Sequence, residues 1–179
     1  TGVCFSNELV DALPVHRVRW QNNQMCEICV AYEGGHFVEC LCQCSTPKLA
    51  KYIDKHKVSL SEGQTTELHI EAEAWMKDVA RVLHCGIVMT IDYGHTASDY
   101  YHSDRKDGTL LCYYRHAISS NPYARIGEQD MTAHVNFSAL ASSGTVSGLD
   151  LVGLTTLAHW LIGLGVEDLV RDQEQESED

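Results

Sequence analysis

Positive charge is scarce in this sequence. The 179 residues contain 13 Lys and Arg against 25 Asp and Glu, which gives a formal net charge of -12. A protein that binds the phosphate backbone of nucleic acid draws its affinity from clustered basic residues, so this composition argues against nucleic-acid binding. An acidic surface instead favours a basic or cationic partner.

Long hydrophobic runs are also missing. The longest apolar stretch, residues 151–166, contains His159, two threonines and three glycines. A membrane-spanning helix needs about 20 mostly apolar residues, so we expect no membrane association. The chain opens with Thr1 and without a secretory signal, so we expect a processed chain or part of a longer protein. The expected location is the bacterial cytoplasm, with the mitochondrial matrix as the alternative.

Proline is rare, with three residues in all, whereas hydrophobic residues make up 44% of the chain. This is ordinary globular composition, which excludes wholesale disorder, and the length fits one domain. We expect that domain to span residues 1–171. The acidic residues 172–179 are expected to form a disordered tail.

The hydrophobic pattern predicts a mixed α/β fold. Gly2–Phe5 and Ile87–Ile91 are short apolar runs that end in polar residues, which is typical of buried parallel strands. Residues 15–44 are interpreted as an antiparallel β-meander, because Gly34-Gly35 and a polar Gln21-Asn22-Asn23 separate strand-like runs. Two later strands are predicted at Thr109–Arg115 and Leu149–Leu154.

Helix caps and helical spacing complete the predicted elements. The predicted helices begin after Thr46-Pro47, cover Leu68–Leu83, run from an Asn136 cap to near Gly144, and cover Leu157–Leu164 after a Thr155 cap. Between the predicted strands, the polar residues 95–108 are expected to form an exposed loop.

Polar side chains follow both predicted parallel strands. Asn7, Glu8 and Asp11 come after the first strand, and Asp92-Tyr93-Gly94 follows the second. In parallel α/β sheets ligands bind outside the carboxyl ends of strands. Carboxylates at that edge can bind a cationic substrate or accept its proton. The competing interpretation of Asn7 and Asp11 is helix capping, and spacing alone does not choose between the two.

A second candidate site is the polar stretch Gly127–His134, which contains Glu128, Asp130 and His134. Polar loops on a rigid scaffold often carry function. The competing interpretation is an ordinary loop with a cap from Asp130 or Thr132.

Eight cysteines without a secretory signal favour reduced thiols over a disulfide framework. Five of them cluster in the predicted meander: Cys26, Cys29, Cys40, Cys42 and Cys44. Thiolates on a hairpin could hold structural zinc, but Cys26 and Cys29 point to opposite faces of one strand. Packed or surface thiols are therefore favoured, and zinc is the alternative. Several histidines are expected at the surface or at strand edges: His16, His36, His56, His69 and His84.

Six segments are distinctive, and they occur in order over nearly the whole chain. They are Asn7–His16, Ile91–His95, Gly108–Leu110, Tyr114–His116, Gly127–Val135 and Gly153–Thr156. Together they resemble the MidA-like family of S-adenosylmethionine-dependent methyltransferases. Mitochondrial members of that family are arginine methyltransferases that assist complex I assembly. Any one segment would be a weak signal, and the ordered set is what gives the resemblance its specificity.

The resemblance implies a class I methyltransferase fold, which is a Rossmann-like α/β sheet with helices on both faces. This chain would be its C-terminal part, with Gly2–Phe5 and Ile87–Ile91 as the fourth and fifth strands. The antiparallel β-meander would be an insertion, and the later strands would complete the sheet. The family's glycine-rich cofactor loop would lie upstream of Thr1, and no Gly-x-Gly after a strand replaces it here.

The resemblance also implies a reaction, namely S-adenosylmethionine-dependent N-methylation of a protein with an accessible arginine. Arginine methyltransferases place acidic residues after the fourth strand, which makes Glu8 the expected guanidinium ligand, assisted by Asp11. Asn7 would shape that loop. The expected substrate-binding residues are Asp92, Tyr93, Glu128, Asp130 and His134, and no metal is expected.

Two alternatives stay open at this point. One is a non-catalytic assembly or interaction module on the same scaffold, and the other is a small zinc module. Dimerisation is one way in which the cofactor pocket could be completed without the upstream strands, so a homodimer is included in the expectation.

Overall fold

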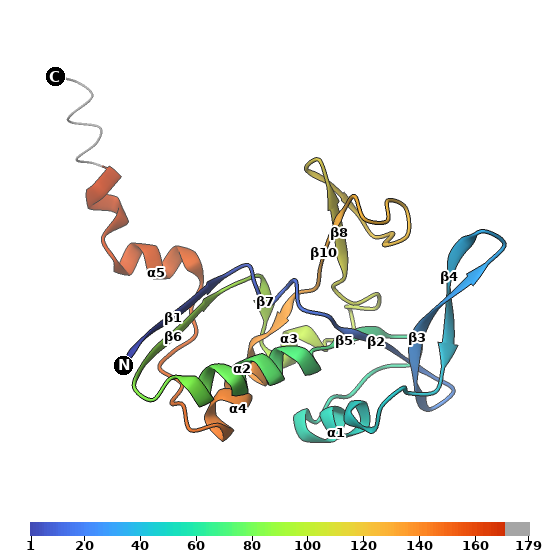
Figure 1. Cartoon of the computed structure of the whole chain (residues 1–179), viewed down its shortest axis with the longest axis horizontal. Helices are drawn as coiled ribbons and strands as arrows, with labels where there is room; N and C mark the ends of the chain where they lie inside the picture. Colours follow the sequence, from blue (N-terminus) through green and yellow to red (C-terminus); the bar gives the residue numbers. More distant parts are fainter. Residues whose placement is uncertain (171–179) are drawn as a thin grey trace. The chain divides into compact units, whose positions relative to one another are not determined.

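The structure of the protein is a computed structural model that describes residues 1–170 (Figure 1). The chain divides into two compact units, Thr1–Leu149 and Asp150–Asp179. The predicted acidic tail, residues 172–179, lies outside the described residues.

Two strands far apart in the sequence form a parallel pair. β1 (Gly2–Asn7) and β6 (Gly86–Ile91) run side by side, with residue 2 opposite residue 86 and residue 7 opposite residue 91. Both predicted parallel strands are therefore confirmed. Because the strands are parallel and in register, their carboxyl ends meet at the same edge of the sheet.

The predicted meander is also confirmed. β2 (His16–Gln21), β3 (Gln24–Glu33) and β4 (His36–Cys42) pair antiparallel, and a fourth strand, β5 (Thr65–Leu68), joins the free edge of β2. β5 was not predicted from the sequence because its first three residues are polar. All four of its residues are buried.

Three helices pack on these sheets within the first unit: α1 (Pro47–His56), α2 (Ile70–Val82) and α4 (Phe137–Val146). The predicted caps of α1 and α4 are confirmed. The Thr46 hydroxyl accepts a hydrogen bond from the Lys48 N–H at 3.3 Å, and the Asn136 amide oxygen accepts one from the Ala139 N–H at 3.1 Å.

The core of this unit consists of two clusters of buried side chains. The first joins the meander sheet to α1 and α4 through Val18, Leu49, Tyr52, Leu68, Tyr100, Tyr101 and Ala139. The second joins the loop after β1 to α2 and α4 through Val10, Ala72, Met76, Val135 and Leu140, and Val88 of β6 packs against it. Helices thus cover the face of the β1–β6 sheet that carries Val88.

The predicted exposed loop at residues 95–108 is wrong in its first part. β7 (Gly94–His95) and α3 (Ala97–Tyr100) occupy it, and two tyrosines at the end of α3 are buried. Tyr100 is 1% exposed and Tyr101 is 9% exposed. The polar residues around these two tyrosines concealed them, because polarity averaged over a segment does not reveal a single buried aromatic pair.

β8 (Leu111–Tyr114) confirms the strand predicted at Thr109–Arg115 but not its place in the sheet. It pairs antiparallel with β9 (Ala117–Ser119) and β10 (Asp130–Thr132) in a separate three-stranded sheet. Arg115 and His116 have φ of 48° and 66°, the turn geometry that folds a strand back as a hairpin. The run therefore pairs locally and does not extend the β1–β6 sheet.

The second unit contains α5 (Leu157–Gly163), as predicted, with Thr156 as its cap in place of the predicted Thr155. The strand predicted at Leu149–Leu154 is wrong. Residues 149–156 form neither helix nor strand, and Val152 is 96% exposed. A short apolar run becomes a strand only when another strand pairs with it, and none does so among residues 1–170. None of the described helices has the length and apolar character needed to cross a membrane.

The expectation of reduced thiols is wrong for two of the cysteines. Cys29 of β3 and Cys42 of β4 form a disulfide, with their Cα atoms 6.3 Å apart. Antiparallel pairing brings their strands together, which the spacing along the chain did not reveal. Among the described residues, no three His, Cys, Asp or Glu side chains gather as metal ligands, so the zinc alternative finds no support there.

Candidate active site

The loops that follow β1 and β6 are tied together by their backbones and by one carboxylate. Glu8, the first residue after β1, donates its backbone N–H to the Ile91 carbonyl at 2.9 Å. Asp92, the first residue after β6, accepts hydrogen bonds at Oδ2 from the N–H groups of Val10 at 2.9 Å and Asp11 at 3.2 Å. Asp92 therefore holds the loop after β1 against the end of β6.

The remaining oxygen of Asp92 is also engaged, since Oδ1 accepts a hydrogen bond from the Tyr93 N–H at 2.8 Å. Burial raises the pKa of Asp92, and the surrounding backbone N–H groups oppose that rise. The structure thus places Asp92 at the predicted position but commits both of its oxygens to the backbone. Its geometry is that of a positioning residue.

Glu8 presents its side chain to solvent at this edge of the sheet. Its φ is 47°, a left-handed conformation that residues with side chains seldom adopt. The Tyr93 hydroxyl donates a hydrogen bond to Glu8 Oε1 at 3.3 Å. The negative charge of Glu8 is the main reason why the pKa of Tyr93 is raised. The neutral phenol of Tyr93 thus orients the Glu8 carboxylate, and the remaining lone pairs of the carboxylate stay accessible to a cation.

Asp11 lies behind Glu8 and is largely buried. The residue is 4% exposed, and its Oδ1 has no hydrogen-bond partner among the described residues. Burial raises the pKa of Asp11, and the nearby charges of Asp92 and Glu8 raise it further. A buried carboxyl group beside two other carboxylates favours a cation, because a positive charge would offset the repulsion and provide a partner for the unpaired oxygen.

The segment before β11 (Val135–Asn136) closes this edge. The Ala133 N–H donates to the Asp11 carbonyl at 3.0 Å, and the Val135 N–H donates to the Tyr93 carbonyl at 2.7 Å. Between these two anchors lies His134, whose Nδ1 is 3.0 Å from Nε2 of His95 in β7. The structure therefore brings the predicted residue His134 beside the acidic loops. It also pairs His134 with His95, which the sequence analysis did not select.

Gly94 allows this close approach of β7 and β11. A Cβ at this position would lie 2.2 Å from the Val135 carbonyl oxygen and 2.7 Å from the Phe137 ring. We expect Gly94→Ala to lower the free energy of unfolding by about 1–3 kcal/mol, because the backbone itself must move. Chemical denaturation of the variant measures this. A Cβ at Gly153 meets no atom within 4 Å, so Gly153→Ala is the matched control. Equal stability of the two variants would contradict the prediction.

A buried polar network lies behind the histidine pair. The Glu67 Oε2 atom accepts hydrogen bonds from the Thr109 N–H at 2.8 Å and from its hydroxyl at 2.9 Å. Glu67 is 0% exposed, and its Oε1 lies 3.8 Å from Arg17 Nε, which is too long for a hydrogen bond. The Thr109 Oγ1 atom also accepts a hydrogen bond from the His134 N–H at 3.1 Å. The network therefore reaches from β5 to the backbone of the candidate site.

Two histidines expected at the surface are in fact buried. His69 is 2% exposed, and its Nε2 is 3.1 Å from the Tyr100 hydroxyl. Burial lowers the pKa of His69 to about 4, and the His134 backbone partly opposes this. The His56 side chain, 7% exposed, contacts Glu73. The only sequence signal for this buried network was the segment Gly108–Leu110, which matched a family pattern without a local explanation.

Three predicted residues do not join the cluster. Asn7 ends β1 with an exposed side chain, and Glu128 and Asp130 are exposed on the far loop and on β10. Within the described part of the chain, none of these side chains forms a hydrogen bond or ion pair with Glu8, Asp11 or His134. Asp130 stands opposite Tyr113 in the β8–β10 pairing. Tyr113 in turn is close enough to Tyr93 to contribute to the raised pKa of Tyr93. Asp130 is therefore connected to the site only indirectly, through Tyr113.

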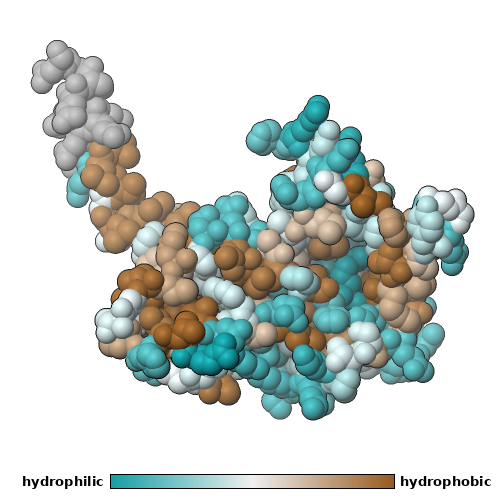
Figure 2. Space-filling model, in the orientation of Figure 1, coloured by the Kyte–Doolittle hydropathy of each residue, from teal (hydrophilic) through white to brown (hydrophobic). Residues whose placement is uncertain are grey.

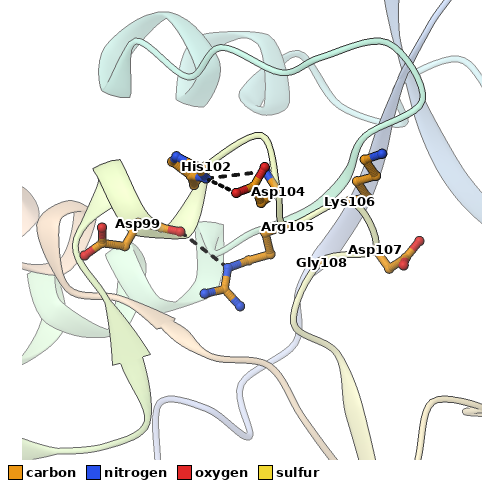
Figure 3. A pocket seen from close by; sticks show the side chains of 7 residues that line it. All are labelled: Asp99, His102, Asp104, Arg105, Lys106, Asp107 and Gly108. Carbon is orange, nitrogen blue, oxygen red and sulfur yellow. Dashed lines mark hydrogen bonds and ion pairs between the residues drawn. The ribbon is translucent and has the colours of Figure 1, made fainter.

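An open pocket of about 610 Å³ lies in the loop between α3 and β8 (Figure 3). Its lining consists of Asp99, His102, Asp104, Arg105, Lys106, Asp107 and Gly108. In Figure 3, Arg105 points back toward α3, where its Nε donates to the Asp99 carbonyl at 3.4 Å. None of the predicted site residues lines this pocket. The pocket is therefore separate from the candidate site.

A comparison with protein families identifies the family of this chain. A family model described as "Putative S-adenosyl-L-methionine-dependent methyltransferase" matches residues 1–155. The chain belongs to this methyltransferase family. The resemblance to the MidA-like methyltransferases is thereby confirmed, and it extends over both strand ends and the histidine pair.

Two solved structures are similar to this member of the methyltransferase family. A candidate methyl transferase from Burkholderia thailandensis, crystallised with S-adenosyl-homocysteine, is 37% identical and superposes with a TM-score of 0.89. The match covers 96% of this chain and 44% of that chain. A native crystal structure from the same organism gives the same identity and TM-score, with 46% of that chain covered. A search of curated proteins gives no significant match.

The chain thus spans less than half the length of the solved relatives it matches. Its mixed α/β fold corresponds to part of a methyltransferase structure. The relative that holds S-adenosyl-homocysteine implies that the family uses S-adenosylmethionine.

Proposed function

We propose that this chain forms the acceptor side of an S-adenosylmethionine-dependent methyltransferase that methylates arginine in a protein. The observation that carries the proposal is the cluster of Glu8, Asp11 and Asp92 at the joined carboxyl ends of two parallel strands. Ligands bind at this edge in α/β folds. A guanidinium is the cation that matches exposed carboxylate oxygens in shape and in hydrogen-bonding geometry.

Within this proposal each residue has a separate role. Glu8, which is exposed and steadied by Tyr93, accepts the N–H groups of the guanidinium and sets its orientation. Asp11, whose buried Oδ1 has no hydrogen-bond partner within residues 1–170, adds negative charge from behind. Asp92 fixes the relative position of the two loops through backbone hydrogen bonds. Alignment of this kind accounts for much of the rate enhancement of a displacement reaction.

The described residues do not by themselves fit the cofactor. They contain no Gly-x-Gly turn after a strand, the feature that lets a backbone approach a nucleotide closely. The cofactor would supply the methyl group. We propose instead that its cradle belongs to the portion of the solved relatives that this chain does not match.

One face of the β1–β6 sheet supports the proposal that this chain is part of a larger domain. Val3, Phe5 and Ile87 share that face and are 70%, 58% and 58% exposed. Parallel sheets are almost always covered on both faces, and this one also has unpaired edges within residues 1–170. An uncovered apolar face fits a piece of a larger α/β domain. We therefore propose that the chain is the C-terminal part of a class I methyltransferase sheet.

Titration calorimetry with S-adenosylhomocysteine tests the proposal. The 179-residue chain is expected to give no saturable binding, and the longer protein proposed to contain it is expected to bind one equivalent per chain. Saturable binding by the short chain would show that the pocket is complete here, for example in a homodimer. Absence of binding by the longer, folded protein would overturn the methyltransferase proposal.

A non-catalytic interaction module is the second candidate, favoured by a different surface. The β3–β4 hairpin exposes Val30, Tyr32 and Leu41 at 53%, 66% and 40%, and hydrophobic residues gather there in Figure 2. Such a patch suits contact with another protein. This candidate predicts partner binding that needs no cofactor and that is unaffected by Glu8→Gln. We also propose that the protein acts in the bacterial cytoplasm, with the mitochondrial matrix as the alternative.

A further inference from the structure

His95 and His134 form a pair that has no role in the guanidinium binding proposed above. The two rings come from different segments, His95 from β7 and His134 from the residue before β11. His95 Nε2 and His134 Nδ1 are 3.0 Å apart, which is a hydrogen bond between two imidazoles. One ring must donate and the other accept, so each ring fixes the tautomer of the other.

Hydrogen bonds fix the backbone segments that carry both rings. β7 and β11 pair in parallel, with Gly94 opposite Val135 and His95 opposite Asn136. The His134 N–H donates to Thr109 Oγ1, and the Thr109 hydroxyl donates to the buried Glu67 carboxylate. Thr109 and Glu67 are therefore positioning residues for the backbone that carries His134.

The surroundings of the pair favour uncharged rings. Burial, together with the nearby Arg105, lowers the pKa of His95, while Asp99 partly opposes this. Burial lowers the pKa of His134 as well, and His95 and Arg105 add to the effect. Within residues 1–170, neither ring forms a hydrogen bond or ion pair with a carboxylate. At neutral pH both rings are therefore neutral and able to take up a proton.

The backbone that carries the pair is joined to the loops of the proposed guanidinium site. The backbone hydrogen bonds from Ala133 to Asp11 and from Val135 to Tyr93 flank His134 on both sides. Tyr93, which contacts Glu8, is two residues before His95. The loops that carry the carboxylates are thus linked through the backbone to the segments that carry the imidazoles.

We propose that the His95–His134 pair is the proton acceptor of this site. The inference rests on the proposed function. Methylation of a guanidinium replaces one N–H bond by an N–CH₃ bond, and the methylated guanidinium keeps its single positive charge, so one proton leaves for each methyl group added. That proton passes to an imidazole nitrogen of the pair, and the pair then releases it to water. Glu8 stays free to hold the cation, because it does not have to carry the proton.

The first test is histidine NMR on the 179-residue chain, which needs neither cofactor nor activity. The rings of His95 and His134 are expected to titrate as a coupled pair, in two macroscopic steps. In His95→Asn, His134 is expected to titrate as a single group and at higher pH, because the neighbouring charge is gone. An unchanged titration of His134 in that variant would overturn the pairing.

The second test is the pH dependence of methyl transfer by the longer protein. His134→Asn is expected to lower kcat by about 10²-fold or more and to remove the acidic limb of the profile, in which protonation of the pair stops the reaction. His84→Asn, at an exposed histidine outside the site, is the matched control and is expected to leave the profile unchanged. Wild-type rate and profile in His134→Asn would overturn the proposal.

A third comparison separates positioning from simple packing. Thr109→Val removes the hydroxyl that links Glu67 to His134 at nearly constant volume, whereas Thr109→Ser keeps it. The valine variant is expected to shift the acidic limb of the pH profile and to lower kcat, with a smaller change in KM. The serine variant is expected to keep the wild-type profile and kcat. Equal profiles in the two variants would overturn the positioning role. A wild-type protein that transfers no methyl group would overturn the proposed function itself, which the first test distinguishes from the pairing.

Discussion

Replacing Glu8 by glutamine is expected to lower the rate of arginine methylation by at least about 10²-fold, because the change removes the charge that orients the guanidinium. Glu8 is the exposed carboxylate of the cluster, and its side chain receives a hydrogen bond only from Tyr93 among the described residues. Glutamine keeps the size and one acceptor oxygen but presents two N–H donors to a substrate that has only donors.

The loss should appear without loss of the fold. Glu8 is exposed and its positive φ is equally available to glutamine, so the free energy of unfolding should stay within about 0.5 kcal/mol of wild type. Methyl transfer to an arginine peptide by the longer protein, followed with labelled cofactor, measures the effect. Glu33→Gln, at the exposed end of β3, is the matched control. A Glu8→Gln enzyme with wild-type kcat would show that Glu8 is not the guanidinium ligand.

Removing the Glu67 carboxylate is expected to produce the largest loss of stability. Glu67→Ala should lower the free energy of unfolding by about 3–5 kcal/mol, the usual cost of breaking a buried ion pair by deleting one partner. The change leaves the Thr109 N–H and hydroxyl without their acceptor, and it leaves the largely buried Arg17 with one carboxylate fewer. Arg17 still contacts Glu39, which limits the loss.

Urea denaturation of the 179-residue chain, followed by circular dichroism, measures this effect. Glu67→Gln should cost less, about 1–3 kcal/mol, since an amide oxygen can still accept from Thr109. Glu33→Ala serves as the surface control and should be nearly neutral. If Glu67→Ala unfolds at the same urea concentration as Glu33→Ala, the network does not stabilise the fold, and the positioning of His134 through Thr109 loses its foundation.

Local patterns in the sequence determined a large part of this structure. The apolar runs at β1 and β6, the meander of β2 to β4 and the caps Thr46 and Asn136 were all predictable. Each depends on side-chain periodicity or on a hydrogen bond within a few residues, so the information lies in one short segment. The position of Glu8 and Asp92 at adjoining strand ends followed from the same patterns, because parallel strands bring their carboxyl ends to one edge. Ordered family segments supplied the methyltransferase assignment.

Only the tertiary structure decided how the remaining residues are used. β8 pairs with its own hairpin and not with β6, Leu149–Leu154 finds no partner strand within residues 1–170, and Cys29 meets Cys42 across two strands. Glu67 reaches Thr109 across 42 residues and His95 reaches His134 across 39. These contacts depend on which distant segments bury each other, and a histidine or glutamate has the same local sequence signature whether it is buried or exposed. The sequence therefore located the edge of the sheet where the chemistry lies, and long-range packing selected the side chains that stand there.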